Sequence, residues 1–89
     1  MAAVRVRFFA TFREVCGPGE TVEGVEDVPG LLDALRARHG VRFERLVRDG
    51  REASFVVLVN GRNVGHLGGP AAMLADGDEV SFFPPVSGG

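Results

Sequence analysis

One long amphipathic helix pattern constrains the fold of this chain more than any other feature. It lies in "DVPGLLDALRARHG", residues 27–40, where apolar residues recur at i, i+3, i+4 and i+7 and therefore share one face. The stripe consists of Val28, Leu31, Leu32 and Leu35. Asp27 and Pro29 are typical of a helix start, and Gly40 is typical of the residue after a helix end. A single stripe of this kind predicts one main helix that covers one face of one sheet.

The other regular patterns have the two-residue period of strands. Apolar and charged residues alternate in "VRVRF", and "FVVLV" is apolar on both faces, which predicts a central strand covered by the helix. Asn60-Gly61 follows that run and has the residue types that tolerate the positive φ angles of a type I′ hairpin turn. The predicted strands are residues 4–8, 20–25, 55–59, the segment after the Asn60-Gly61 turn, and 79–84.

Three shorter segments complete the predicted order of elements. Residues 10–17 are expected to form a helical turn or a structured loop, and residues 43–47 and 71–74 short helical turns. We expect the first and last strands to lie side by side at the centre of a mixed sheet. The prediction is an α+β fold of the ubiquitin-like β-grasp type, with a body at residues 1–83 and a flexible, extended tail at residues 84–89.

Length and composition reduce the number of possible classes of function. The 89 residues allow one hydrophobic core and little room for an enclosed active site, which favours a binding or carrier module. The formal net charge is −2 and no segment concentrates basic residues, which disfavours nucleic acid as a partner. The longest strictly apolar run, residues 55–59, is far shorter than a membrane span, and residues 1–9 do not have the pattern of a secretory signal. With a single cysteine, these features predict a cytoplasmic protein.

The conventional catalytic residue types do not combine into a motif. Cys16 lies on the apolar stripe of "FREVC", which favours a small buried core residue over a nucleophile. His39, at the end of the main helix, and His66, in a glycine-rich loop, do not form a metal-ligand pattern with Cys16, so no metal site is expected. The acidic residues around Gly77 are interpreted as turn residues; they are Asp76, Asp78 and Glu79.

The terminal stretch "FFPPVSGG" has features that a small domain does not need for folding. Pro84 and Pro85 have no N–H groups, so they end strand pairing and hold the chain extended. The residues that follow are slender enough for a narrow channel; they are Val86, Ser87, Gly88 and Gly89. Extended, residues 84–89 reach about 20 Å from the body, and the reactive group at the tip is the α-carboxylate of Gly89.

The sequence resembles the small subunit of molybdopterin synthase and related ubiquitin-like sulfur carrier proteins. Four stretches carry the likeness in the same order: "FFATFREVCG", "FVVLVNGRNV", "LADGDEVSFFPP" and the terminal "VSGG". The last two are the most specific, and the four together cover the chain from end to end.

The resemblance implies a mechanism centred on Gly89. An ATP-dependent adenylyltransferase of the ubiquitin-activating type adenylates the Gly89 carboxylate, and a persulfide from a cysteine desulfurase or rhodanese-type donor replaces AMP to leave a thiocarboxylate. The tail then enters the large subunit of molybdopterin synthase and delivers sulfur to precursor Z. Gly88 and Gly89 are the functional residues implied. The chain itself is then a non-catalytic carrier subunit that binds no cofactor, because ATP is used by the activating enzyme.

Docking to such partners requires a surface beside the tail. Alternation in the last strand places Val80 and Phe82 on one face and Ser81 and Phe83 on the other. If the first pair is core, Phe83 points outward as a candidate anchor; the alternative is that residues 9–12 or the loop cover it. The other expected docking residues are Pro84, Pro85, Val86 and Ser87. Further candidates to meet acidic partner residues from neighbouring strands, where a solvated face is the simpler account, are Arg5, Arg7 and Arg62.

Three other functions fit the same tail. They are a sulfur carrier for thiamine, cysteine or tRNA thiolation, a protein modifier conjugated through Gly89 to lysines, and an inert ubiquitin-fold interaction module. All 10 basic residues are arginine, so the chain cannot extend isopeptide-linked polymers on its own lysines. This composition disfavours a polymeric tag but is compatible with single attachment.

Overall fold

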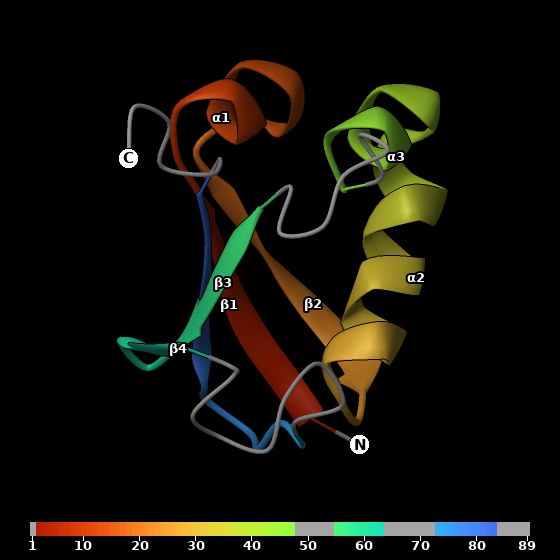
Figure 1. Cartoon of the computed structure of the whole chain (residues 1–89). Helices are drawn as coiled ribbons and strands as arrows, with labels where there is room; N and C mark the ends of the chain where they lie inside the picture. Colours follow the sequence, from red (N-terminus) through yellow and green to blue (C-terminus); the bar gives the residue numbers. More distant parts are fainter. Residues whose placement is uncertain (1, 48–54, 64–72, 84–89) are drawn as a thin grey trace.

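The computed structural model describes residues 2–47, 55–63 and 73–83, which form one mixed sheet with helices packed on one of its faces (Figure 1). In chain order the elements are β1 (Ala2–Phe8), α1 (Thr11–Cys16), β2 (Gly19–Val25), α2 (Val28–His39), α3 (Val41–Val47), β3 (Val56–Val59), β4 (Arg62–Asn63) and β5 (Glu79–Phe83). The predicted tail at residues 84–89 and His66 lie outside the described residues.

The first and last strands pair at the centre of the sheet, as predicted. The strand order is β2-β1-β5-β3-β4, and β1 and β5 are parallel while the other pairs are antiparallel. Val6 is opposite Val80 and Phe8 is opposite Phe82 in the central pair. With α2 across one face, this topology confirms the β-grasp fold.

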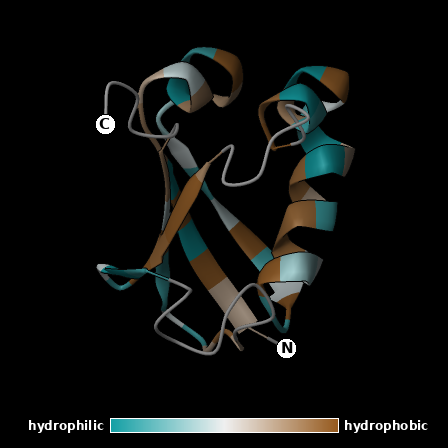
Figure 2. Cartoon of the chain, viewed as in Figure 1, coloured by the Kyte–Doolittle hydropathy of each residue, from teal (hydrophilic) through white to brown (hydrophobic). Residues whose placement is uncertain are grey.

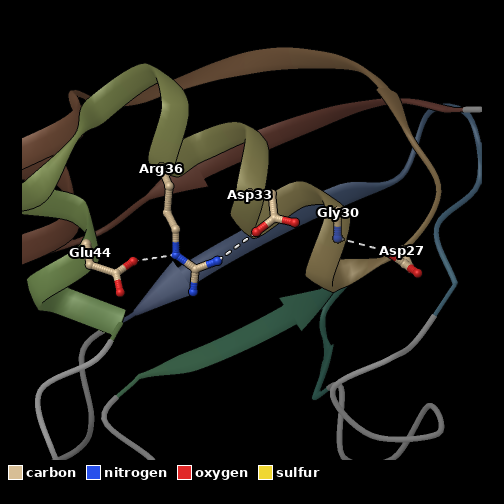
Figure 3. Close-up of polar contacts among 5 residues, drawn as sticks. All are labelled: Asp27, Gly30, Asp33, Arg36 and Glu44. Atoms are coloured by element: carbon tan, nitrogen blue, oxygen red, sulfur yellow. Dashed lines mark hydrogen bonds and ion pairs between the residues drawn. The ribbon is translucent and has the colours of Figure 1, made fainter.

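The main helix has the ends that its sequence predicts. The side chain of Asp27 accepts a hydrogen bond of 2.8 Å from the Gly30 N–H and so caps the first turn (Figure 3). At the other end, the Gly40 N–H donates to the carbonyl of Arg36 at 2.8 Å. The Arg36 guanidinium bonds to Asp33 one turn earlier and to Glu44 on α3, so it links the two helices (Figure 3).

The β3–β4 hairpin also follows its sequence pattern. Asn60 and Gly61 have φ angles of 52° and 82°, the positive values that the predicted turn requires. β3 is hydrophobic along its whole length, whereas α2 alternates between hydrophobic and hydrophilic segments (Figure 2). Strand β3 is not fully enclosed, however, because only alternate residues, Val57 and Val59, are buried.

The centre of the core is aromatic. Four fully buried phenylalanine rings come from four different elements: Phe8, Phe12, Phe43 and Phe82. The ring centroids of Phe12 and Phe82 are 5.6 Å apart, and the Phe43 ring lies 6.1 Å from Phe12 and 6.2 Å from Phe82. Aromatic contacts at such distances add stability beyond the burial of apolar area. Through them, α1 and α3 are fixed against the central strands.

One short segment differs from its prediction. Residues 71–74 were expected to form a helical turn, but Met73 instead makes an isolated antiparallel bridge with Asp27. Leu74 continues this contact by donating its N–H to the carbonyl of Glu26 at 2.8 Å. The prediction is wrong for Met73 and Leu74, because pairing with the chain just before α2 satisfies their backbone groups. Residues 71 and 72 lie outside the described residues.

Core packing under α2 is testable by truncation. Leu35 has 0% exposure, and Leu35→Ala is expected to lower the free energy of unfolding by about 2–5 kcal/mol because it leaves a cavity. Val41→Ala is the control: Val41 is 64% exposed at the start of α3, and the expected change is about 0.5 kcal/mol or less. Urea unfolding followed by circular dichroism measures both variants. Equal losses would contradict the placement of Leu35 in the core.

Candidate functional site at the root of the tail

Two consecutive phenylalanines at the end of β5 face opposite sides of the sheet. Phe82 is fully buried with Val80 under the helices, as the strand period predicts. Phe83 is half-buried and, by the same alternation, faces the other side of the sheet. Helices α2 and α3 lie on one side of the sheet and leave that other side open (Figure 1). Phe83 is the last described residue before the predicted tail.

Phe83 is also stacked against a neighbouring ring. The Phe9 ring lies parallel to it, with centroids 4.4 Å apart and planes inclined by 5°. The Phe9 N–H donates to the carbonyl of Phe82 at 3.1 Å, so the pairing of the central strands extends past the end of β1. Both alternatives for Phe83 therefore hold in part, because it points to the open face and is covered on one side. Phe9 was not among the predicted site residues. The two-residue period could have identified it, because Phe9 continues the series of Arg5 and Arg7 on the same face of the strand.

The charged part of the open face adjoins this stack. The Arg7 guanidinium lies over the Phe9 ring, 5.5 Å from its centroid. The carboxylate of Glu79 is 3.5 Å from the Arg5 guanidinium and 3.9 Å from that of Arg7. Arg62 was predicted on a neighbouring strand, but it lies on β4, which β5 and β3 separate from β1.

Strand β3 completes the face with two half-buried apolar residues. Val56 is opposite Phe83, and Leu58 is opposite Ser81. We name this surface the tail-root face; it comprises Arg5, Arg7, Phe9, Val56, Leu58, Glu79, Ser81 and Phe83. Its polar side chains are the Ser81 hydroxyl, the Glu79 carboxylate and the two guanidinium groups, and the carboxylate is paired with both arginines. The remaining side chains are apolar and suited to binding. The other predicted docking and functional residues, Pro84, Pro85, Val86, Ser87, Gly88 and Gly89, lie outside the described residues.

Asp76 and Asp78 are turn residues, as predicted, whereas the third acidic residue, Glu79, is the first residue of β5. Asp78 accepts a hydrogen bond of 2.8 Å from the Ala75 N–H, and Asp76 accepts one of 2.9 Å from the Ala3 N–H. Asn60 donates to Asp78 and accepts from the Glu79 N–H, both at 2.9 Å. These carboxylates therefore hold the turn before β5 against β1 and the β3–β4 hairpin.

Cys16 is not an activated nucleophile. It is half-buried and packs against the core. Burial, with a smaller contribution from the charge of Glu20, raises the pKa of its thiol to about 11, against the opposing charge of Arg42. In the part of the chain that the structure describes, no three His, Cys, Asp or Glu side chains group as metal ligands, and no helix is long and apolar enough to cross a bilayer.

A second charged cluster ties the end of α2 to the start of β2. The Glu20 carboxylate lies 2.5 Å from Nε2 of His39 and 2.5 Å from the Arg38 guanidinium. Partial burial opposes ionisation of Glu20, but the hydrogen bonds and charges of His39 and Arg38 outweigh it and lower the pKa of the carboxyl. The His39 ring also packs edge-on against Phe8, 5.8 Å between centroids.

A β-grasp body with a binding face at the root of a C-terminal tail defines the class of ubiquitin-like carrier and modifier proteins. Residues 6–89 match the model of the ThiS family, and the chain belongs to this family. It is 48% identical over 90 residues to "Small archaeal modifier protein 3" of Haloferax volcanii, with 97% of this chain and 98% of that protein covered. It is 37% identical over 86 residues to the "Molybdopterin synthase sulfur carrier subunit" of Escherichia coli, covering 97% and 99%.

A solved structure agrees with the fold. The solution structure of small archaeal modifier protein 1 from Methanosarcina acetivorans superposes with a TM-score of 0.85 at 35% identity, covering 100% of this chain and 98% of that one. The predicted resemblance to ubiquitin-like sulfur carriers is therefore confirmed at the level of the family.

The Glu20 cluster predicts a loss of stability in acid. Because the pKa of Glu20 is lowered in the folded state, its stabilisation is present above the unfolded pKa and disappears as pH falls through the folded pKa. Glu20→Gln is expected to cost about 1 kcal/mol or less at pH 6, since the cluster is partly exposed, and less still near pH 3. Urea unfolding at the two pH values measures the difference. A loss of unfolding free energy that does not change with pH would contradict the ion pair. Glu23→Gln is the control, because Glu23 is at an exposed position on the same strand.

Proposed function

We propose that this chain is a sulfur carrier and the small subunit of a molybdopterin synthase, with the Gly89 carboxylate as the carrying group. The observation that supports it best is the family match, which runs to residue 89 and includes the tail. The second support is the tail-root face, in which the Phe9–Phe83 stack and the apolar residues of β3 lie beside the residue where the predicted tail begins.

The chemistry needs two partner enzymes and no cofactor on the carrier. In the first step, a Gly89 carboxylate oxygen attacks the α-phosphate of ATP on an adenylyltransferase of the ubiquitin-activating type and expels pyrophosphate. In the second, the terminal sulfur of a donor persulfide attacks the acyl carbon and expels AMP. A thiol of the donor system then cleaves the sulfur–sulfur bond, which leaves the thiocarboxylate on Gly89 and a disulfide on the donor.

The tail residues have the properties that delivery into an enclosed site requires. Pro84 and Pro85 stop the ladder of β5 and favour an extended chain. Gly88 has no Cβ, so partner backbone atoms can approach the reacting carbonyl closely. In the proposed function, Val86 and Ser87 fit the channel of the large subunit, where the thiocarboxylate transfers sulfur to precursor Z.

A second candidate is a protein modifier conjugated through Gly89 to lysines of other proteins. The observation that favours it is the 48% identity to a protein named as an archaeal modifier, against 37% to the named sulfur carrier subunit. Sulfur delivery to thiamine, cysteine or tRNA thiolation is a further alternative, because only the receiving enzyme would differ. These three candidate functions share the adenylated Gly89. They differ in the nucleophile that attacks its acyl carbon.

The thiocarboxylate is directly measurable. When the chain is co-expressed with its host's adenylyltransferase and sulfur donor, the intact mass is expected to rise by the exchange of one oxygen for sulfur, located on the C-terminal peptide. Deletion of Gly89, or one residue added after it, is expected to abolish the exchange without unfolding the body. A wild-type protein that is adenylated but never gains sulfur would exclude both carrier functions.

The modifier function predicts a different product in the same cells. Digestion of their proteins would then yield target peptides whose lysines carry the C-terminal residues of this chain through an isopeptide bond. For a dedicated carrier, we expect no such peptides and a loss of molybdenum cofactor when the gene is deleted. Restoration of the cofactor by the Gly89-deleted protein would contradict the role of the tail.

A further inference from the structure

Strand β2 is at one edge of the sheet, so one row of its backbone groups has no partner strand (Figure 1). Phe8 donates its N–H to the carbonyl of Pro18 at 3.1 Å, which fixes the hydrogen-bonding phase of the β1–β2 ladder. Every second residue of β2 from Pro18 onward therefore faces β1, and the residues between them direct their N–H and C=O groups to the outer edge. These outward-facing residues are Gly19, Thr21 and Glu23.

This edge is exposed and its hydrogen-bonding groups are nearly all unused. Among the described residues, the three outward N–H groups have no hydrogen-bond partner, and the contact made to the carbonyls is a long one of 3.4 Å, from Arg38 to Thr21. Gly24, with a φ angle of 78° next to the irregularity in the β1–β2 register, ends the regular strand. Residues 19–23 can therefore accept one short added strand.

A groove of about 420 Å³ lies beside this edge, on the side of the sheet that carries Arg5 and Arg7. Gly19, one of its lining residues, is opposite Arg7 and has no side chain to fill the space. A Cβ on Gly19 would lie 2.4 Å from the carbonyl oxygen of Val6, so this position requires glycine. Arg7 is 57% exposed and 3.9 Å from its nearest carboxylate, that of Glu79. A carboxylate that reached over Gly19 from an added strand would therefore find a cation available for pairing.

Antiparallel pairing with β2 of a second copy supplies such a carboxylate. With Thr21 on the two-fold axis, the outward groups of Thr21 face those of its counterpart, and the outward groups of Gly19 face those of Glu23. Threonine pairs across antiparallel strands are favourable. Glu23 of one copy then lies in line with Gly19 and Arg7 of the other. The Cα atoms of Glu23 and Arg7 are two strand spacings apart, about 10 Å, which the two long side chains can bridge together.

Charge favours this arrangement over the parallel one. A parallel in-register pair would place Glu20 opposite Glu20 and Glu23 opposite Glu23, and like charges directly opposite are destabilising. In the antiparallel pair, Glu23 is opposite glycine. On the helical side, Arg38 of each copy lies near the axis, but its guanidinium is already paired with Glu20 of its own chain at 2.5 Å.

We propose that two copies of this chain associate edge to edge through antiparallel pairing of residues 19–23, with Glu23 of each copy paired with Arg7 of the other across Gly19. This association does not depend on the proposed function. The two-fold axis places the ends of the two β5 strands at opposite ends of the joined sheet, so both predicted tails are left free. Strands of five residues bury less area than a standard interface, and the expected dissociation constant is on the order of 100 µM.

Sedimentation equilibrium of the full chain tests the association, in reducing buffer to prevent a disulfide through Cys16. The wild-type protein is expected to be monomeric at about 10 µM and largely dimeric at about 500 µM. Thr21→Pro removes an outward N–H and no bond to β1, and is expected to raise the dissociation constant at least about tenfold. Glu23→Arg is expected to raise it about tenfold by placing like charges together, and Arg7→Glu/Glu23→Arg to restore it to within about threefold of wild type.

Glu26→Arg is the matched control, because it makes the same change of charge at an exposed position outside the paired residues. It is expected to leave the dissociation constant within about twofold. Hydrogen exchange adds a local readout: the amides of Gly19, Thr21 and Glu23 are expected to exchange more slowly at the higher protein concentration, and to lose that protection in Glu23→Arg.

Three results would overturn the proposal. They are a wild-type monomer at about 500 µM, a dimer that neither Thr21→Pro nor Glu23→Arg weakens, and a charge swap that does not restore association. Urea unfolding checks that each variant is folded; if Thr21→Pro is not, Glu23→Arg and its charge swap decide. Protection of the same three amides by an added protein, in a wild-type chain that stays monomeric, would assign the edge to that partner and also overturn the dimer. Failure of Gly89 to gain sulfur would remove the proposed function and leave this association standing.

Discussion

The rest of this structure depends on the packing of Phe82. Its ring lies 5.6 Å from Phe12, 5.7 Å from Phe8, and 6.2 Å from both Phe43 and Phe55. These rings come from β1, α1, α3 and the residue just before β3, so one side chain joins both halves of the sheet to the helical layer. A parallel pair of distant strands is entropically costly to bring together, and this aromatic contact, with the burial of the aliphatic core residues, offsets that cost.

The two-residue period of β5 links the buried position of Phe82 to the outward position of Phe83. Because Phe82 is locked inward, Phe83 must face outward, and Phe9 meets it in a parallel stack. The predicted tail therefore follows directly after a strand whose Phe82 is fully buried and whose Phe83 is stacked on Phe9. A slender tail that starts from a fixed point can be presented in one direction, whereas one that started from a fraying strand end could not.

Patterns of short range were enough to predict most of the fold. The stripe of α2, its Asp27 cap, the Asn60-Gly61 turn and the alternation in β1 and β5 each depend on neighbours in sequence, and the structure confirms them. The environment of Phe83 could not be decided in this way, because its stacking on Phe9 depends on the register between β1 and β5. The prediction for Arg62 was wrong for the same reason. The two-residue period of a strand shows which face a residue is on, but only the topology of the sheet shows which strands are neighbours.

A body of this kind does not itself select between carriage of sulfur and modification of proteins. Under the proposed function both begin with the same acyl-adenylate on Gly89, and the outcome depends on whether a persulfide sulfur or a lysine amine reaches the acyl carbon first. Burial raises the pKa of the Cys16 thiol to about 11, so among the described residues this cysteine does not compete as a nucleophile. Under the proposed function, relatives named for either role can share one fold, because the nucleophile belongs to a partner protein and not to the β-grasp body.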